Sequence, residues 1–443
     1  MTDVVYGNKP ETIIRSDHRN SASVTNQVLL GTWLELKDSH GDWLKVVTAG
    51  RGPGGWVHKD DVRDTPCLKI FYVDVGQGDG AIVESPTGNL LIDGGPSKKF
   101  HSFLRSLYWP TIKTGKKIHF HAVVMSHPDL DHYRGLTTVL GDPDFTFGKI
   151  FHNGIIRYDK SKPGHPAFDL GTLGTDVNGQ TFLSETYSNL GQAQALVDDG
   201  RLMATFRDFW EAAAKAKSEG RLQSAQRITS RDGLLPGFKS QGPDKLHIDV
   251  LGPVPTKNSG KVEFVTFPDP HDHPSLTASS SHTRNGHSVV LKLTFGSHTF
   301  LFGGDLNIPA QDYLIKAHED TNPFQVDVAK ACHHGSSDFK VDFLKKVNPQ
   351  VNVFSSGDNK SFDHPMADAV GAIGKYARGK IPLLFSTELA RAENSSGTHY
   401  GLINARSNGE TLVMAQMKEQ HKNKADIWDS FTVPWIGKFP EMV

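Results

Sequence analysis

Two imidazoles and two carboxylates stand within six residues in the stretch HPDLDH, which begins at His127. The apolar run 122–126 before this stretch predicts a buried strand that ends in a tight turn. We expect His127 and Asp129 to face one position beside the turn, and Asp131 and His132 to reach a second position. Imidazole and carboxylate together suit Zn or Mn, and adjacent pairs of them suit a two-metal centre. The stretch therefore predicts a metal site.

Helix capping offers another explanation for part of this pattern. Either Asp129 or Asp131 could cap a helix that begins near His132. A cap uses one carboxylate, so it leaves the other carboxylate and both histidines unexplained. The metal site accounts for all four side chains and is the better interpretation.

Acidic and histidine side chains also follow other short apolar runs. Asp93 follows LLI, Asp305 follows FLFGG, and the pair His333 and His334 follows VDVAKAC. Helical signals separate the later runs, as in NIPAQDYLIKAHE, DFLKKV and MADAVGAIGKYA. Strands that alternate with helices and carry ligand-like residues at their ends indicate a layered α/β protein.

Five ordered motifs resemble the metallo-β-lactamase superfamily, and most closely the nuclease-like domain of ComEC-type DNA-uptake proteins. The motifs are FYVDVGQGDGAIVESPTGNLLIDGG, VVMSHPDLDHYRGL, NGHSVVLKLTFGSHTFLFGGDL, KACHHGSS and SSGDNKSFDHP. The resemblance covers about 68–386, apart from an insertion. It implies an α/β fold of the αββα sandwich type.

The resemblance also implies which residues hold metal: His127, Asp129, Asp131, His132, His287, Asp305 and His334. An aspartate at the position of Asp129 is common in ComEC-type sequences. Asp305 matches the acid that bridges two cations, which a two-metal site holds about 3.5–4 Å apart. The role of His287 stays open, because Asn285 and Ser288 fit a ComEC-type pattern whose middle residues vary.

Further residues match supporting positions of these motifs. Asp93 would orient the ligand turn from behind, although a turn at Gly94-Gly95 explains it equally well. Asp79 belongs to a glycine-rich turn beside the site and would also support the ligands. His333 would point away from the metal in an extended segment and contact phosphate or substrate instead.

The stretch SSGDNKSFDHP supplies polar groups that suit a substrate. Ser356 and Asn359 could donate hydrogen bonds to a phosphate, and His364 could protonate a leaving oxygen. A loop with capping residues, in which His364 precedes Pro365 at a helix start, is the plainer alternative.

These assignments predict a metal-dependent hydrolase, with two divalent ions, Zn or Mn, that activate a water for attack on a phosphodiester. Asp131 would orient or deprotonate this water, and His364 would assist the leaving oxygen. The many oxygen ligands make Mn a rival to Zn. The resemblance implies a nuclease of DNA or RNA. A hydrolase of a small nucleotide or phosphodiester and a non-catalytic binding protein are the alternatives.

Composition limits the possible partners and compartments. With 48 basic and 49 acidic residues, the chain has no overall field that favours nucleic acid, so such a substrate needs a local patch such as KTGKK at 113–117. Two distant cysteines predict no disulfide framework and fit a reducing compartment. The N-terminus resembles no secretory signal, and no apolar run approaches the roughly 20 residues of a membrane span. We expect a cytoplasmic protein without a membrane partner.

Two domains are expected. Residues 1–65 resemble a bacterial SH3-like β-barrel, with at least two of the three tryptophans Trp33, Trp43 and Trp56 in its core and a protein or peptide as its partner. Residues 66–443 would form the hydrolase domain. An insertion at about 151–242 contains one helix with an apolar face of Leu202, Phe206, Phe209 and Ala213. The insertion is interpreted as a lid or substrate-shaping subdomain, or as simple elaboration.

Overall fold

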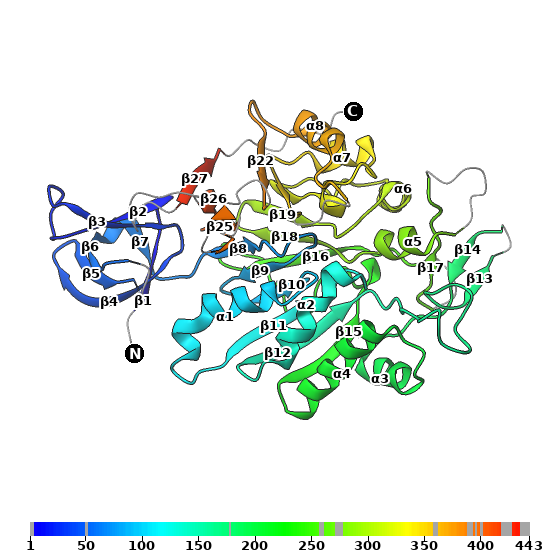
Figure 1. Cartoon of the computed structure of the whole chain (residues 1–443). Coiled ribbons are helices and arrows are strands. Elements are labelled where there is room, and N and C mark those ends of the chain that lie inside the picture. The colour runs from blue at the N-terminus through cyan, green and yellow to red at the C-terminus, as the bar shows by residue number, and fades with distance from the viewer. Residues whose placement is uncertain are drawn as a thin grey trace.

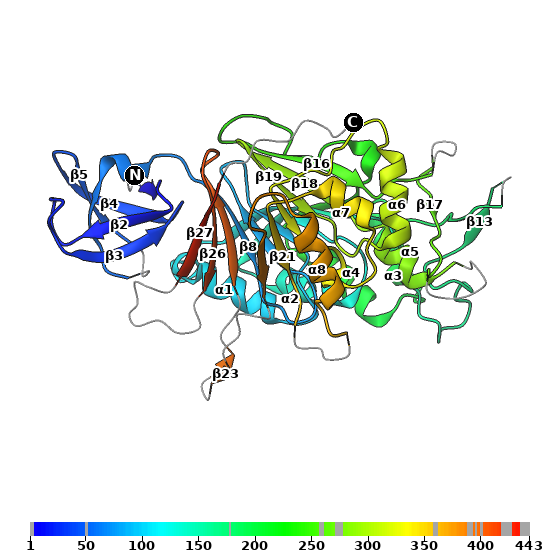
Figure 2. The same ribbon diagram turned by 90° about the horizontal axis from the view of Figure 1, so that it is seen from above.

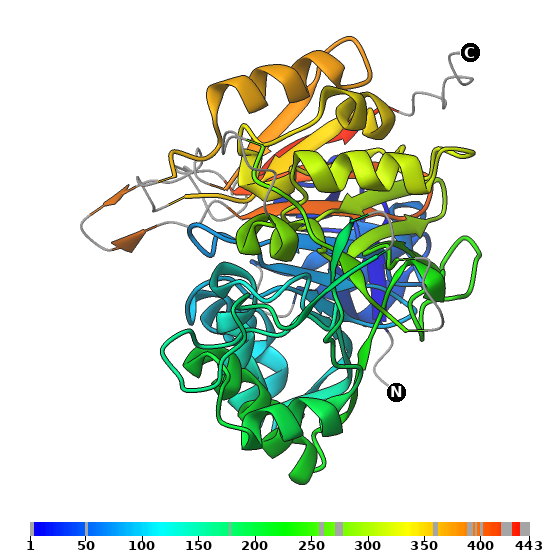
Figure 3. The ribbon, with the colours of Figure 1, turned by 90° about the vertical axis from the view of Figure 1, so that its right-hand side faces the viewer.

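The structure is a computed structural model, and it describes residues 4–48, 52–176, 179–256, 261–270, 278–357, 362–387, 393–394, 397–398, 402–417 and 428–434. In this part of the chain, two large sheets lie face to face and helices cover their outer faces (Figure 1). Figure 3 shows the layers from the side, with cyan and green helices below the sheets and yellow and orange helices above them. The α/β class predicted from the sequence is confirmed, and the layers follow the order αββα.

The first sheet has nine strands in the order β15-β12-β11-β10-β9-β8-β25-β26-β27. Its strands are β8 (Leu68–Tyr72), β9 (Ala81–Glu84), β10 (Leu90–Ile92), β11 (Ile118–Val124), β12 (Phe145–His152), β15 (Leu222–Arg227), β25 (Ile403–Ser407), β26 (Leu412–Met417) and β27 (Trp428–Val433). The last three strands come from the C-terminal part of the chain, and β25 pairs antiparallel with β8.

The second sheet has six strands in the order β16-β18-β19-β20-β21-β22. They are β16 (Leu246–Gly252), β18 (Val290–Phe295), β19 (His298–Phe302), β20 (Val328–Lys330), β21 (Val351–Phe354) and β22 (Leu383–Ser386). Two small sheets lie outside the sandwich. They consist of β13 (Leu173–Thr175), β14 (Thr181–Leu183) and β17 (Phe264–Val265), and of β23 (Glu393–Asn394) and β24 (Gly397–Thr398).

Apolar side chains from both sheets fill the space between them. Ile70, Val124, Leu291, Phe300 and Val353 are all buried in this central core. Strands that are buried on both faces are typical of sheets covered by helices, and their sequences read as continuous apolar runs. This explains why apolar and polar residues alternate little in the segments VVM, FLF and VNVF.

Helices cover the outer faces and form separate cores with them. On the first sheet lie α1 (Lys99–Ile112), α2 (Leu130–Gly141), α3 (Leu190–Asp198) and α4 (Ala204–Ser218). On the second sheet lie α6 (Ile308–Ala317), α7 (Val341–Val347) and α8 (Ala367–Tyr376), and the short helix α5 (Ser280–Gly286) precedes β18. The helices expected at 307–319, 342–347 and 366–377 are confirmed.

The segment expected to be an insertion is largely built into the sandwich. Helix α4 packs against α2, and Phe206, Phe209 and Ala213 are fully buried in the same core, as the apolar spacing predicts. Strand β15 then joins the first sheet parallel to β12. Strands β13 and β14 lie at the end of the molecule opposite the N-terminal sheet (Figure 1, with β13 also labelled in Figure 2).

The N-terminal sheet lies beside β25–β27 (Figure 1). Its order is β3-β2-β6-β5-β4-β1-β7, and its strands are β1 (Val4–Gly7), β2 (Glu11–Arg15), β3 (Val24–Leu29), β4 (Trp33–His40), β5 (Trp43–Val47), β6 (Gly55–His58) and β7 (Val62–Arg63). Within the described residues β3 and β7 are open edges, so a closed SH3-like barrel stays a prediction. The division at residues 65 and 66 also stays a prediction.

The tryptophans of this sheet do not form its core, contrary to the sequence interpretation. Aliphatic side chains such as Ile14, Leu34 and Val57 fill the interior. Trp33, Trp43 and Trp56 are half-buried, and the ring of Trp56 lies 5.2 Å from His18 and 5.8 Å from the Lys45 ammonium. The glycine and tryptophan spacing therefore marks the strands correctly, but the interior is set by the alternating aliphatic residues.

Candidate metal centre

Parallel strands bring ligand-like residues to one edge of the sandwich. Strand β10 pairs parallel with β11 in the first sheet, and β19, β20 and β21 pair parallel in the second. Because the carboxyl ends of parallel strands lie at the same edge, the segments that follow these strands meet there.

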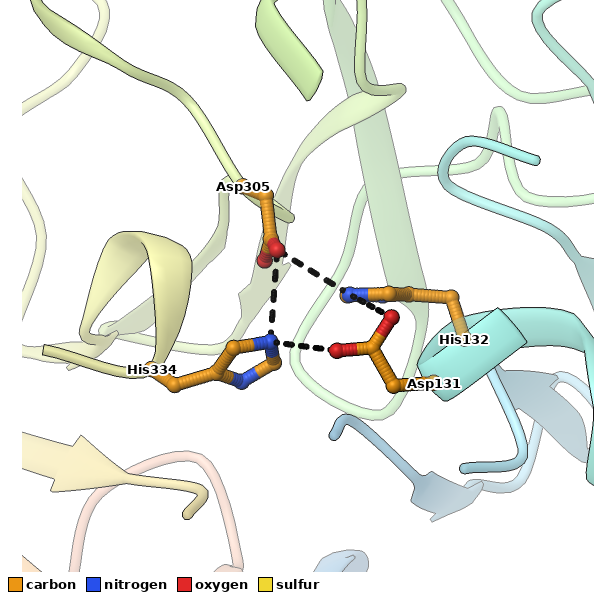
Figure 4. A group of neighbouring side chains, drawn as sticks. All are labelled: Asp131, His132, Asp305 and His334. Carbon is orange, nitrogen blue, oxygen red and sulfur yellow. Dashed lines mark ion pairs between the residues drawn. The ribbon is translucent and has the colours of Figure 1, made fainter. Parts of the chain in front are cut away.

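Four side chains converge at this edge (Figure 4). Oδ2 of Asp305 lies 3.3 Å from Nε2 of His132 and 3.2 Å from Nε2 of His334. Asp131 reaches the same histidines, with Oδ1 3.9 Å from His132 Nε2 and Oδ2 3.4 Å from His334 Nε2. We call Asp131, His132, Asp305 and His334 the ligand cluster, because two carboxylates and two imidazoles surround one point.

The turn after β20 has a left-handed backbone conformation that directs both of its histidines toward Asp305. His333, His334 and Gly335 have consecutive positive φ angles of 49°, 56° and 84°. Such angles cost of order 1–3 kcal/mol at residues other than glycine and cluster at functional sites. The sequence interpretation of His333 assumed an extended segment, but the segment is not extended. Instead, Nε2 of His333 lies 3.8 Å from Oδ2 of Asp305, on the same side as His334.

A glycine-rich turn presses on the first turn of α2. Gly78 has φ 140°, and a Cβ there would lie 2.3 Å from the carbonyl oxygen of Asp131. The neighbouring N–H of Asp79 donates to this oxygen over 3.1 Å. Only glycine permits such an approach. The turn thus fixes the backbone that carries the Asp131 carboxylate.

Hydrogen bonds behind the cluster set the tautomers of its two histidines. Nδ1 of His132 donates to Oδ2 of Asp93 over 2.9 Å, while Oδ1 of Asp93 accepts from the N–H of Ser126 over 2.8 Å. Nδ1 of His334 donates to the carbonyl oxygen of Ser355 over 2.9 Å. With Nδ1 engaged in both rings, Nε2 is the atom that faces the cluster, which is the arrangement that metal-bound histidines use.

A buried lysine supports the carboxylates from below. Nζ of Lys330 contacts Asp79, lies 3.8 Å from Asp305 Oδ1, and donates to the carbonyl oxygen of Gly304 over 3.2 Å. Asp79 also lies 3.1 Å from Nδ1 of His334. Lys330 is 3% exposed, so its charge acts on these carboxylates with little screening by water.

The charges of the cluster shift the pKa values of its members strongly. Burial opposes the charged form of His132, but Asp305, Asp93 and Asp131 outweigh it and hold its pKa well above the usual value. For His334, burial again opposes the charge, and Asp305 and Asp79 raise the pKa well above the usual value. Burial likewise disfavours the Asp305 carboxylate, yet the histidines hold its pKa well below its ordinary range. Protons on the imidazoles therefore balance the acids when no cation is bound.

The donor set fits a divalent cation. Nε2 of His132, Nε2 of His334 and Oδ1 of Asp305 are buried and have no hydrogen-bond partner. Buried polar atoms without partners are costly, unless an ion or water meets them. Two imidazoles and two carboxylates suit Zn and Mn, and Asp131 leaves one side open to the cavity described below.

Asp129 takes part in a different interaction. Its Oδ1 accepts from Arg157 over 2.7 Å, and its Oδ2 lies 2.8 Å from Nε of Arg284. Burial disfavours the Asp129 carboxylate, but Arg284, His127 and Arg157 hold its pKa well below the usual value. Asp129 occupies the N-cap position of α2, yet its side chain makes no capping hydrogen bond. The carboxylate is thus paired with two guanidinium groups and does not cap the helix, and its role as a metal ligand stays a prediction.

His127 is fully buried next to the cluster. Its Nδ1 lies 3.1 Å from Oγ of Ser126 and 3.2 Å from Oγ of Ser288. Its Nε2 lies 3.8 Å from Oδ2 of Asp129 and 4.0 Å from Oδ2 of Asp305. Burial and the charge of His132 lower the pKa of His127 to about 3, so the ring is neutral.

His287 is not one of the four residues of the ligand cluster. Its Nε2 bonds to the carbonyl oxygen of Val265 over 2.7 Å, and its ring lies 4.7 Å from the rings of both Phe264 and Phe267. Burial lowers its pKa to about 4. The neighbouring Ser288 supports the centre instead, because its Oγ accepts from the N–H of Asp305 over 3.1 Å.

A cavity of about 790 Å³ opens in front of the ligand cluster. Its lining includes Asp131, Asp305 and His334 together with the cationic side chains of Lys99, Arg134 and Arg284. Phe362, which is 51% exposed, and His364 complete one wall. The cavity therefore joins the candidate metal centre to positive charge and to an aromatic surface.

The remaining predicted substrate contacts, His364, Ser356 and Asn359, differ in their positions relative to the cavity. His364 lines the cavity, and Nε2 of Gln77 donates to its Nδ1 over 3.0 Å. Burial and the charges of His334 and His333 lower the pKa of His364 to about 4. The side chain of Ser356 is buried and is not part of the cavity lining, and its N–H donates to Thr387. Asn359 lies outside the described residues.

Several residues of the site were missed by sequence reasoning. No motif marks these residues as part of the site, because their partners are distant in the chain. They are Arg157, Arg284, Lys330 and Gln77. Only Lys330 carried a usable signal, since it is a charged residue within the apolar run VDVAKAC. Charged residues are almost never buried without a partner.

No protein-family model and no curated protein matches the sequence. Among solved structures, the metallo-β-lactamase fold protein YhfI from Bacillus subtilis is 13% identical, with a TM-score of 0.33 over 75% of this chain and 100% of its own. CmlA, a diiron β-hydroxylase from Streptomyces venezuelae, is 11% identical, with a TM-score of 0.34 over 74% of this chain and 55% of its own. A long form RNase Z from yeast is 10% identical, with a TM-score of 0.33 over 72% of this chain and 40% of its own.

Within the described ranges, every helix is too short or too polar to cross a lipid bilayer.

Proposed function

We propose that this protein is a metal-dependent hydrolase of the metallo-β-lactamase superfamily, similar to ComEC-type nuclease domains, that cleaves phosphodiester bonds. One observation carries the proposal. Asp131, His132, Asp305 and His334 converge with unpartnered buried donor atoms at the floor of a cavity that cations line. Zn and Mn both suit these ligands.

A bound divalent ion lowers the pKa of a water toward neutrality and polarises a phosphoryl oxygen. Asp131 is 31% exposed, while His132, Asp305 and His334 are at most 4% exposed. Its carboxylate is therefore the group that can orient the attacking water and accept its proton. Asp93 and the carbonyl of Ser355 hold the two imidazoles in position throughout.

We propose that His364 acts on the leaving oxygen, because it lines the cavity in front of the ligand cluster. Because the amide of Gln77 donates to Nδ1, the neutral ring carries its hydrogen on Nε2. A neutral imidazole with this tautomer donates a hydrogen bond to an oxygen that develops negative charge. His333 lies 5.8 Å from the His364 ring and provides a second donor on the same wall.

The substrate that we propose is a DNA or RNA strand. Lys99, Arg134 and Arg284 supply local positive charge in the cavity, although the chain as a whole is nearly neutral. Phe362 is exposed at the wall and lies 5.8 Å from the His364 ring, an arrangement that suits stacking of an unpaired base. Both features fit a single strand that enters the cavity.

A small nucleotide or phosphodiester is the second candidate substrate. A volume of about 790 Å³ falls within the range of pockets that enclose small ligands, which is about 300–1,000 Å³. This volume would take one or two nucleotides. Cleavage of small esters together with failure to cleave DNA and RNA would favour this candidate.

For the N-terminal sheet we propose a binding role in a separate domain at 1–65. Trp43 and Trp56 are half-buried rather than core residues, so part of each ring is available to a protein or peptide partner. Aromatic side chains of this kind are enriched at binding surfaces.

The proposal is tested by metal analysis followed by assays on bis-p-nitrophenyl phosphate and on single- and double-stranded DNA and RNA. We expect metal-dependent cleavage by the wild type and loss of cleavage in His334→Ala. Arg134→Gln, which changes the cavity wall without touching the ligand cluster, should retain metal. A metal-free wild type or a fully active His334→Ala would refute the proposal.

A further inference from the structure

The two metal positions predicted from HPDLDH are not equivalent in the structure. The position served by Asp131 and His132 is completed by Asp305 and His334. The other position was expected to use His127 and Asp129, and His287 was a further candidate ligand whose role stayed open. Its donors differ from the expectation at two of these three residues, and this difference bears on how many ions the centre holds.

The first difference is the pair of guanidinium groups on Asp129. Arg157, which follows β12, lies 2.7 Å from one carboxylate oxygen, and Arg284, in α5, lies 2.8 Å from the other. The side chains of Arg157 and Arg284 are 12% and 11% exposed, so both contacts are shielded from water. Charge-assisted contacts in such surroundings are strong. A cation at Asp129 would have to displace them or lie beside two positive charges.

The second difference is the direction of His287. Its Nε2 is bonded to the carbonyl oxygen of Val265, and its ring lies 4.7 Å from the rings of both Phe264 and Phe267. His127 is then the remaining imidazole of this position, and it can share only Asp305 with the ligand cluster. Catalytic zinc sites use three protein ligands, so one imidazole and one shared carboxylate make an incomplete site.

The net charge at Asp129 is the same with two arginines as with a second ion. A divalent cation on the Asp129 carboxylate would leave a net charge of +1. Two guanidinium groups on the same carboxylate leave the same net charge of +1. Arg284 also lines the cavity, so this positive charge faces the place where a phosphoryl oxygen would lie.

We infer that the centre binds one divalent ion, through Asp131, His132, Asp305 and His334, and that the guanidinium groups of Arg157 and Arg284 supply the positive charge that a second ion would bring. This inference rests on the proposed metal-dependent function. It assigns Asp129 the role of holding the two arginines, and it assigns Arg284 to the binding of the substrate's phosphate.

The first test counts ions. Metal-free protein is loaded with excess Mn²⁺, passed over a desalting column and analysed for metal content and by electron paramagnetic resonance. We expect one Mn²⁺ per chain with the spectrum of an isolated ion. Two ions per chain with an exchange-coupled spectrum would overturn the inference and leave the proposed function intact. No bound ion would overturn both.

The second test compares two isosteric variants of residues in the stretch HPDLDH. Asp131→Asn removes a ligand and should weaken Mn²⁺ binding at least 10-fold in a calorimetric titration. Asp129→Asn should bind one Mn²⁺ per chain with affinity within about 3-fold of wild type. An equal loss in both variants would overturn the inference. If Asp129→Asn does not fold, the count of ions in the wild type still decides the question.

Discussion

Nδ1 of His132 lies 2.9 Å from Oδ2 of Asp93, and neither side chain is more than 1% exposed. The other oxygen of Asp93 accepts from the N–H of Ser126, at the end of the strand that carries the hexapeptide. One carboxylate therefore ties the imidazole to the backbone of its own turn. The same contact directs Nε2 of His132 toward Asp305.

Removing the negative charge of Asp93 should weaken metal binding without removing a ligand. Partners of this kind contribute about 10–100-fold to metal affinity. We expect Asp93→Asn to raise the dissociation constant for Zn²⁺ or Mn²⁺ by that factor and to keep the number of bound ions unchanged. Competition with a chromophoric chelator measures the constant. Unchanged affinity would show that Asp93 serves only the turn.

Metal binding should release protons and strengthen with pH. The pKa values of His132 and His334 lie well above 6.5 in the metal-free protein, because carboxylates surround both rings. These protons stabilise the metal-free fold below the unfolded pKa, and this stabilisation is lost as the pH rises through the folded pKa values. A metal must displace both protons, so its affinity should rise about 100-fold per pH unit while both rings are protonated. Calorimetry in buffers of different ionisation enthalpy counts the protons. No release at pH 7 would contradict this assignment.

Lys330 should stabilise the metal-free protein by balancing Asp79 and Asp305. Removing one member of a buried ion pair typically costs about 3–5 kcal/mol. We expect Lys330→Met to lower the free energy of unfolding by about that amount. Saturating Mn²⁺ should recover part of the loss, because a cation replaces the missing charge. Urea denaturation with and without metal measures both values, and equal losses in the two conditions would contradict the account.

His152 should make stability sensitive to acid, independently of the metal centre. The ring is fully buried, with Tyr187 stacked 4.4 Å away, and burial and Arg227 lower its pKa to about 3. The unfolded chain binds the proton at about 6.5, so stability is full above that pH and falls as the pH drops below it. Because of this one ring, the free energy of unfolding should be about 2 kcal/mol lower at pH 5 than at pH 7.

The matched comparison for this effect is His152→Phe against His40→Gln. The phenylalanine variant should lose this part of the pH dependence of unfolding. His40 is exposed, so its replacement removes a histidine without changing the core and serves as the control. Parallel curves for wild type and His152→Phe would show that His152 does not contribute.

The layers of the sandwich and the cluster around Asp305 could be foreseen because both depend on local pattern. Apolar runs buried on both faces mark the strands, and ligand-like residues directly follow them at Asp93, Asp305 and His334. Helix α4 was visible in its apolar spacing, but nothing in the sequence showed that it would pack on α2. The pairing of β25 with β8 was equally hidden, because such long-range contacts depend on the whole fold.

The roles of Asp129 and His287 could not be foreseen for a similar reason. Residue type alone makes both plausible ligands. The directions of their side chains depend on contacts with Arg157, Arg284 and the carbonyl of Val265, which lie between 22 and 155 positions away in the chain. Likewise, the left-handed turn at His333 and His334 reverses the direction that an extended segment would give. In this protein, therefore, the local sequence predicts which residues are candidate ligands. The direction in which each side chain points depends on tertiary contacts.

We propose that the ligand cluster holds a divalent ion and that Asp131 orients the water that attacks a phosphodiester. The most direct measurement is the rate of bis-p-nitrophenyl phosphate cleavage by wild type and Asp131→Asn at saturating Mn²⁺. We predict that wild-type cleavage is abolished by chelator, is restored by Mn²⁺, and exceeds that of Asp131→Asn by about 10²–10⁴-fold. Equal rates in the two proteins, or cleavage that survives complete metal removal, would contradict the account.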